Sequence, residues 1–275
     1  MSTRRAAWTA SVAALLACAV AACSSPSASS VERASRRTPH SVGNAAVRAA
    51  EAAASAMTSA SVRPTGSPAA EIDPAPFLGR PLKRAPFATR KVALTLDDGP
   101  SRNTAEVLSI FERLNARCTF FFVGGRVRGY RSVAKQAYET GFEIGNHTWD
   151  HQEIHETPLA FDLKEIDRCQ AELVEVTGHE AVFVRPPTGH WDDATLRATG
   201  ERGMVLALWS LHGQDTGPGT HARTITSGVL RSARGGDVIL LHETNPETVK
   251  ALPAIIEGLR AKGLEPVTLS ELLTR

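Results

Sequence analysis

The sequence contains few cysteines and few aromatic residues, and its longer C-terminal part carries no excess of basic residues. Four of the 275 residues are cysteines and 5% are aromatic. Two cysteines lie in the first 23 residues, so export would leave Cys118 and Cys169 as one possible disulfide or as two buried small side chains. Residues 85–275 contain 21 basic and 25 acidic residues. Because nucleic-acid-binding domains concentrate Lys and Arg, we expect no nucleic-acid partner.

The first 23 residues are typical of an export signal rather than of a membrane span. Two arginines precede an apolar stretch from Ala6 to Ala22 that is too short and too rich in alanine for a span. Residues 20–23 resemble a bacterial lipobox, in which Cys23 would be lipidated and become the mature N-terminus. Ordinary signal cleavage at the preceding alanines is the alternative. The sequence therefore predicts an exported protein, either a cell-surface lipoprotein or a secreted protein. In the lipoprotein, the lipid anchor would be the only contact with the membrane.

Residues 24–84 lack the apolar side chains that a folded core needs. They consist mainly of Ser, Ala, Pro, Thr and Arg, and no aromatic residue occurs between Trp8 and Phe77. Such a segment buries too little apolar surface to offset the entropy lost on ordering. We predict a disordered tether over residues 24–84, followed by a catalytic domain over residues 85–275.

The predicted domain alternates short apolar runs with amphipathic segments, a pattern typical of parallel α/β folds. The candidate strands cover residues 92–96, 119–123, 142–144, 182–184, 204–208, 238–241 and 266–268. The candidate helices cover residues 104–114, 132–140, 158–177, 193–200, 221–233 and 248–262. An eight-fold barrel usually needs about 250 residues. We therefore expect a compact, distorted (β/α) barrel with about seven parallel strands, present as a monomer.

Polar residues occur at or shortly after the ends of these predicted strands. They are Asp97, Asp98, His147, Arg185, Asp215 and His242. Because the carboxyl ends of parallel strands open onto one face, we expect these side chains to converge in an active site there. Each has a structural alternative when taken alone: a solvated turn for the Asp-Asp-Gly-Pro run, a solvent-exposed arginine for residue 185, and a satisfied core histidine for residue 242.

The spacing of two histidines and the pairing of two aspartates predict a metal site. His147 and His151 would lie on the same side of one helical turn, within reach of a single ion. An oxygen ligand from the pair Asp97 and Asp98 would complete a site of two histidines and one carboxylate, which suits zinc best and also accepts cobalt, nickel or manganese. The metal beside one carboxylate and an arginine beside the other would offset their repulsion.

Together these motifs resemble the polysaccharide deacetylase family, also described as the NodB-homology or carbohydrate esterase 4 domain, over residues 90–269. The matching motifs are Thr-Leu-Asp-Asp-Gly at 95–99, His-Thr-Trp-Asp-His at 147–151, Arg-Pro-Pro-Thr-Gly at 185–189 and Leu-Leu-His at 240–242. The fourth motif is altered, because residues 212–216 read His-Gly-Gln-Asp-Thr where the family usually has Asp-Ser-x-Asp-Trp.

The resemblance implies one divalent metal, Zn²⁺ or alternatively Co²⁺, and a role for each matching residue. The implied metal ligands are Asp98, His147 and His151. The implied catalytic residues are Asp97 as general base, His242 as general acid, Arg185 orienting Asp97, and Asp215 orienting His242. The candidate substrate and oxyanion contacts are the backbone N–H of Thr188, Leu240, and Trp209 or Trp191 as an aromatic platform. Four further histidines have no predicted role and are expected at the surface: His155, His179, His190 and His221.

The implied function is metal-dependent removal of N-acetyl groups from an N-acetylglucosamine-containing polysaccharide, peptidoglycan or chitin-like, with release of acetate. One alternative is an O-acetyl esterase acting on acetylated xylan or a related glycan. Another is a non-catalytic lipoprotein that binds the cell wall, which the altered fourth motif favours and the retained chemical residues oppose. In each case the partner is an acetylated polysaccharide.

Overall fold

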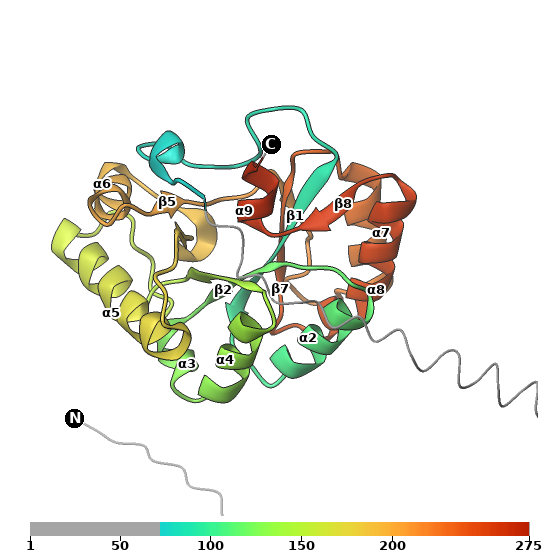
Figure 1. Cartoon of the computed structure of the whole chain (residues 1–275), viewed down its shortest axis with the longest axis horizontal. Helices are drawn as coiled ribbons and strands as arrows, with labels where there is room; N and C mark the ends of the chain where they lie inside the picture. The colour runs from blue at the N-terminus through green and yellow to red at the C-terminus, as the bar shows by residue number, and fades with distance from the viewer. Residues whose placement is uncertain (1–71, 275) are drawn as a thin grey trace, which may run out of the picture. The chain divides into compact units, whose positions relative to one another are not determined.

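The computed structural model describes residues 72–274, and the predicted signal peptide, Cys23 and most of the predicted tether lie outside this range. Its centre is an eight-stranded sheet in which every pairing between strands is parallel (Figure 1). The strands are β1 (Lys91–Gly99), β2 (Thr119–Phe122), β3 (Glu143–Asn146), β4 (Phe183–Val184), β5 (Val205–Leu206), β6 (Leu211–His212), β7 (Val238–His242) and β8 (Glu265–Val267). They follow the order β5-β4-β3-β2-β1-β7-β6, while β8 pairs with the first residues of β1. The curled parallel sheet confirms the predicted α/β fold.

Helices surround the strands (Figure 1). They are η1 (Ala75–Phe77), α2 (Thr104–Arg113), α3 (Gly124–Val127), α4 (Arg131–Glu139), α5 (Leu159–Thr177), η2 (Pro187–Gly189), α6 (Asp193–Glu201), α7 (Ala222–Ser232), α8 (Pro246–Ala261) and α9 (Leu269–Leu273). Local chemistry sets several ends. Asn245 caps α8 through its side chain, and Gly178 ends α5 with a φ of 77°. Between residues 72 and 274, no helix combines the length and apolar character needed to cross a membrane.

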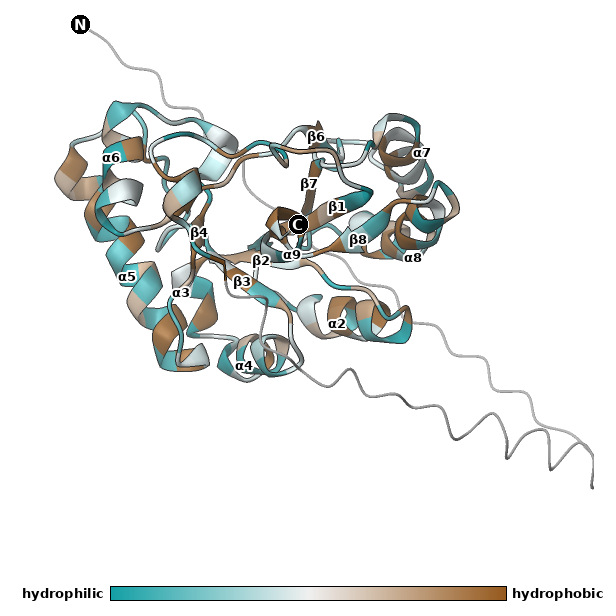
Figure 2. Cartoon of the chain, turned by 45° about the horizontal axis from the view of Figure 1, so that its top comes forward, coloured by the Kyte–Doolittle hydropathy of each residue, from teal (hydrophilic) through white to brown (hydrophobic). Residues whose placement is uncertain are grey.

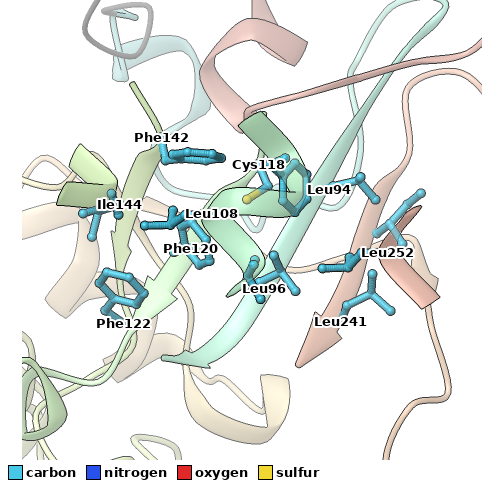
Figure 3. Packing of buried hydrophobic residues seen from close by; sticks show 14 of the residues in the cluster. Leu94, Leu96, Leu108, Cys118, Phe120, Phe122, Phe142, Ile144, Leu241 and Leu252 are labelled. Carbon is cyan, nitrogen blue, oxygen red and sulfur yellow. The ribbon is translucent and has the colours of Figure 1, made fainter. Parts of the chain in front are cut away.

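The sheet is buried on both faces by two separate hydrophobic clusters. Successive residues of each strand point to opposite faces and so belong to different clusters. On β1 and β2, Leu94, Leu96, Phe120 and Phe122 belong to the layer that packs against the outer helices (Figure 3). Residues that point to the other face of these strands, including Ala93 and Phe121, belong to a second cluster inside the curl of the sheet. In Figure 2 the ribbon of β7 is hydrophobic along most of its length, whereas the helices alternate between polar and apolar residues.

Both cysteines of the domain are free and buried. Cys118 directly precedes β2, and Cys169 lies on α5, where its Sγ is 3.5 Å from the carbonyl oxygen of Phe122. Burial raises the pKa of the Cys169 thiol to about 12. Of the two alternatives left open by the sequence, the structure therefore shows the pair of buried small side chains.

The ordered domain begins earlier than the sequence predicts, so the predicted end of the tether at residue 84 is wrong. The N–H of Leu82 donates to the carbonyl of Leu206 at 2.8 Å, and the N–H of Leu208 donates back to Leu82 at 2.7 Å. Arg84 forms an ion pair with Asp237 at 2.6 Å. Local composition misses this segment because its order depends on pairing with β5, a strand far away in the sequence.

Candidate active site and metal centre

The predicted polar residues meet on the inner face of the sheet, at the carboxyl ends of its strands. Asp97 lies within β1 and pairs in register with His242, the last residue of β7. His147 follows β3 directly, and Arg185 follows β4. Since Thr95 and Asp97 are two residues apart on one strand, both lie on the face opposite the outer core layer. The strand positions thus bring together groups that are far apart in the sequence.

Arg185 and Asp97 form a fully buried ion pair. The Arg185 side chain is 0% exposed, and its Nη1 lies 2.7 Å from Asp97 Oδ1. The same nitrogen donates to Thr95 Oγ1 at 2.8 Å, while Nε and Nη2 donate to the backbone carbonyls of Ala207 and Leu208. The guanidinium also lies over the ring of Phe121. Arg185 is therefore held in one position, and it holds the carboxylate of Asp97 in turn.

Asp98, His147 and His151 form a cluster that could hold a metal ion, with one ligand atom from each residue within 4.8 Å of the others. Asp98 Oδ1 lies 2.9 Å from His151 Nε2 and 3.7 Å from His147 Nε2. His147 Nδ1 lies 2.7 Å from the carbonyl oxygen of Arg185. Because a carbonyl only accepts, Nδ1 carries the proton, and the Nε2 lone pair faces the carboxylates.

Two further observations show that this cluster suits a cation. Among the described residues, the buried Asp98 Oδ1 has no hydrogen-bond partner of good geometry. Burial raises the pKa of Asp98, but the contact with His151 and the charge of the neighbouring histidines outweigh it and lower the pKa to about 2. Burial lowers the pKa of His147, although the nearby carboxylates favour its charged form. A carboxylate with a lowered pKa beside an imidazole with a lowered pKa is a combination that favours metal coordination.

His147 and His151 lie close together, with ring centroids 5.0 Å apart, but the predicted helical turn between them is wrong. Residues 147–151 are not helical. Instead, Thr148 and His151 adopt positive φ angles of 63° and 64°, which fold the loop back so that both rings reach Asp98. Asp98 and Thr188 also have positive φ, at 70° and 62°. Such strained backbone in residues other than glycine concentrates at functional sites.

His242 and Asp215 form a second pair beside the metal cluster. His242 Nδ1 lies 3.0 Å from Asp215 Oδ1, and the other carboxylate oxygen accepts from the His242 N–H at 2.6 Å and from Thr248 Oγ1 at 2.7 Å. Burial lowers the pKa of His242, but the hydrogen bond and charge of Asp215 outweigh it, and the pKa is raised. The pair therefore favours a protonated His242 whose Nε2 is not used by Asp215.

The predicted substrate contacts differ in how accessible they are. Thr188 is exposed on the loop of η2, and Trp209 is half-buried, with its ring against Gly189 and a centroid 6.1 Å from that of His212. Leu240 is only 3% exposed and lies two residues before His242 on the same strand face. The direct substrate contact predicted for Leu240 therefore has little surface available to it.

The sequence analysis missed the residues that hold Arg185 and Asp215 in place. Thr95 accepts from Arg185 and donates to the carbonyl of Ile239 at 2.8 Å. Its position two residues before Asp97 was the available signal, because strand residues two apart share a face. Thr248 and Asn245, which hold Asp215, lie at the start of α8 and carry no signal that links them to residue 215.

Comparisons with known proteins agree with this geometry. A sequence profile described as polysaccharide deacetylase matches residues 84–207. A peptidoglycan-N-acetylglucosamine deacetylase of Bacillus cereus is 35% identical over 191 residues, which cover 66% of this chain and 87% of that protein. A bifunctional xylanase/deacetylase of Pseudobutyrivibrio xylanivorans is 34% identical over 66% of this chain, but the match spans 30% of that longer protein. The structure of a family 4 acetyl xylan esterase from Clostridium thermocellum in complex with a cobalt ion is similar with a TM-score of 0.61 and 33% identity, covering 66% of this chain and 89% of that one.

Proposed function

The chain belongs to the polysaccharide deacetylase family and is a hydrolase, and we propose that it removes N-acetyl groups from an N-acetylglucosamine-containing polysaccharide of the cell wall, releasing acetate. The observation that carries this proposal is the placement of three groups around one strand end: the buried Asp97–Arg185 pair, the Asp/His/His cluster and the His242–Asp215 pair. Amide hydrolysis needs a base, an electrophile and an acid, and these three groups supply one each. The similarity to a peptidoglycan deacetylase supports the substrate class.

Asp98, His147 and His151 would hold the metal ion, and we propose zinc because imidazole and carboxylate ligands with open positions suit it. Cobalt is the alternative, and a related esterase contains it. When bound, such an ion polarises the acetyl carbonyl and lowers the pKa of a water molecule to about 7. The ion would lie between the two histidine rings, which the loop holds close together, and the Asp98 carboxylate at the end of β1.

Asp97 would act as the general base. Its Oδ1 is occupied by Arg185, whereas its Oδ2 lies 3.7 Å from His147 Nε2 and faces the metal cluster. As water attacks the acetyl carbonyl, Asp97 accepts its proton and a tetrahedral intermediate forms. Arg185 prevents the carboxylate from rotating, because four hydrogen bonds fix the guanidinium. Arg185 thus positions the Asp97 carboxylate without touching the substrate.

His242 would act as the general acid, and the N–H of Thr188 would stabilise the oxyanion. The C–N bond breaks as protonated His242 gives its proton to the departing nitrogen, leaving acetate and a free sugar amine. Asp215 holds the ring by Nδ1 and stabilises its charged form, so that Nε2 carries the transferable proton. Amide cleavage depends strongly on this step because an unprotonated amide nitrogen is a very poor leaving group.

The second candidate is an O-acetyl esterase, favoured by the similarity to the Clostridium thermocellum acetyl xylan esterase. It would use the same metal ligands and Asp97. An alkoxide leaves more readily than the amide anion that an unprotonated nitrogen would have to form, so the reaction would depend less on His242. The fourth motif has His212 and Thr216 where the family usually has Asp and Trp, and this change is compatible with a different glycan.

The deciding experiment measures acetate release by the exported chain, residues 24–275, on N-acetylglucosamine oligomers and on acetylated xylan. The protein is stripped of metal and then resupplied with zinc or cobalt. We expect metal-dependent release from the amino-sugar oligomers that Asp97→Asn abolishes and His242→Ala reduces about 10²- to 10⁴-fold. Release from xylan alone, with His242→Ala partly active, would establish the esterase instead. No release from either would favour the non-catalytic cell-wall-binding lipoprotein.

We also propose that the enzyme acts outside the cell, anchored through Cys23 or secreted. The predicted export signal supports this location, as does the similarity to an enzyme named for a cell-wall polymer. Mass spectrometry of the mature N-terminus tests the anchor: a diacylglyceryl-modified Cys23 supports it, whereas an unmodified N-terminus at residue 22 or 23 indicates secretion.

A further inference from the structure

A second cluster of metal-ligating side chains lies in two loops that also carry active-site residues. Glu153 and His155 follow His151 in one loop, and His190 follows η2, two residues after Thr188, in the other. One ligand atom from each of Glu153, His155 and His190 lies within 4.8 Å of the others. We propose that these three side chains form a second zinc site, separate from the site at Asp98.

The distances between the ligand atoms suit tetrahedral zinc. Glu153 Oε2 lies 3.3 Å from His155 Nδ1 and 3.8 Å from His190 Nδ1. Zinc bonds of about 2.0–2.1 Å separate neighbouring tetrahedral ligands by about 3.3–3.4 Å. The two imidazoles lie close together, with ring centroids 4.9 Å apart. Small side-chain rotations would therefore bring the three atoms onto one ion, with water as a fourth ligand.

The two ring nitrogens are both available to a cation. His155 Nδ1 is buried, and among the described residues it has no hydrogen-bond partner of good geometry, although Glu153 is near. A buried polar atom without a partner is unfavourable, and a metal ion would satisfy it. His190 Nδ1 is contacted by Thr188 Oγ1 at 3.2 Å, and both residues are exposed. This hydroxyl can turn to solvent when the ion takes the nitrogen lone pair.

The two loops are held together independently of any cation, so the cluster is largely formed in advance. The N–H of Glu156 donates to Asp192 Oδ2 at 2.7 Å, and Thr195 Oγ1 donates to the carbonyl of Ile154. Ile154 is fully buried and anchors its loop in the core. A preorganised site loses less entropy when it binds, so three ligands are enough for measurable affinity.

A zinc ion here would link the loop of His151 to the loop of Thr188. The ion would lie toward solvent, because the side chains of His190 and Glu153 are 64% and 46% exposed. Exposure leaves water ligands in place and weakens binding, so this site would release zinc before the site at Asp98 does. Its role would be to add one more link between these loops rather than to take part in the reaction.

The test is a zinc titration of the metal-free exported chain by calorimetry, with bound metal counted after equilibrium dialysis. We expect two zinc ions per wild-type chain, the second at least tenfold weaker than the first. His155→Ala combined with His190→Ala should leave only the tighter ion, and His151→Ala should selectively weaken the tighter one. His179→Ala, which removes the exposed histidine that follows the end of α5, should leave both ions bound.

A stoichiometry of one for the wild type would overturn the proposal, as would two ions bound to the double variant with unchanged affinity. Circular dichroism without zinc checks that the double variant is folded. If it is not, Glu153→Gln replaces it, because among the described residues this exposed carboxylate accepts no hydrogen bond from the core. We expect this variant to weaken only the second ion, at least tenfold. The count of bound zinc does not depend on acetate release, so this proposal and the proposed function can fail separately.

Discussion

At the scale of single residues, the most consequential interaction is the ion pair between Arg185 and Asp97. Both side chains are almost completely buried, so each charge depends on the other for compensation. Removing one partner of a buried pair costs about 3–5 kcal/mol, because the remaining charge stays without a counter-ion. We therefore expect Arg185→Met to lower the free energy of unfolding by about that amount, measured by urea denaturation with metal present.

The matched control for this variant is Arg197→Met. Arg197 forms an ion pair with Glu201 on the surface of α6, with both side chains well exposed. Exposed pairs contribute about 0–1 kcal/mol, so this variant should unfold close to the wild-type urea concentration. Equal unfolding midpoints for the two variants would contradict the importance assigned to the buried pair.

The second residue-scale prediction concerns the pH dependence of acetate release. Asp215 raises the pKa of His242, and only protonated His242 can act as the acid. The rate should therefore fall as pH rises through this pKa, which lies above the usual value of 6.5. Asp215→Asn removes the charge that raises it, so the alkaline decline should move to lower pH while the maximal rate also falls.

The pH profiles are compared with that of Asp167→Asn, which alters an exposed pair with Arg202 and should leave the profile unchanged. The pH at half-maximal kcat is the quantity to compare. If Asp215→Asn lowered kcat without moving the alkaline decline, Asp215 would position the ring but would not set its proton affinity. A decline at the same pH in His242→Gln would assign the titration to another group.

At the scale of secondary-structure elements, the loop around η2 controls how Thr188 is presented. Gly189 has a φ of 77°, and a Cβ built on it would lie 2.3 Å from the ring of Trp209. Gly189→Ala therefore has to move either the tryptophan or the loop. Displacements of about 1 Å near a reaction can cost about a hundredfold in rate. We expect a loss of about tenfold to a hundredfold in kcat/KM, measured by acetate release.

Gly200→Ala is the control for that substitution. Gly200 lies in α6, and a Cβ there would meet nothing within 4 Å. Because alanine favours a helix over glycine by about 1 kcal/mol, this variant should be equally active and slightly more stable. Full activity in Gly189→Ala would mean that neither the loop conformation nor the Trp209 contact matters for turnover.

The elements also show where sequence patterns suffice. β1 and β7 are predictable because strands buried on both faces contain mainly apolar runs. Helix ends are predictable where a capping residue marks them, as Gly178 does at the end of α5. The two-residue β6 and the four-residue α3 are not, because periodicity needs more residues than they contain. The loop of His151 defeats prediction for a different reason: its positive φ angles are imposed by contacts and not by glycine.

At the scale of the whole described domain, the predicted polar side chains converge because topology does most of the positioning. Every strand pairing is parallel, so residues at strand ends reach the same side wherever they lie in the sequence. Asp97 and Asp98, His147, Arg185 and His242 could therefore be grouped from strand ends alone. The supporting contacts of Thr248 with Asp215, and the cluster of Glu153 with His190, join loops and helix starts, for which no register rule exists.

The same topology leaves β5 at one end of the sheet order, where the segment around Leu82 pairs with it. Leu82 is 7% exposed, and Ile72, Phe77 and Leu78 pack against the same inner cluster. Burying one leucine contributes about 1.5–3 kcal/mol. A fragment of residues 85–275 should therefore unfold with a free energy at least about 3 kcal/mol lower than that of residues 72–275, because it loses several such contacts and two hydrogen bonds to β5.

Urea denaturation of the two fragments measures this difference, and Leu82→Ala in the longer fragment isolates one contact. Lys83→Ala is its control, because the neighbouring side chain is exposed. We expect the leucine variant to lose about 2–5 kcal/mol and the lysine variant almost nothing. Equal stability of the two fragments would mean that the edge of β5 needs no partner and that the domain begins at residue 85 after all. A less stable short fragment would show that residues 72–84, the last part of the predicted tether, belong to the fold that positions the candidate active site.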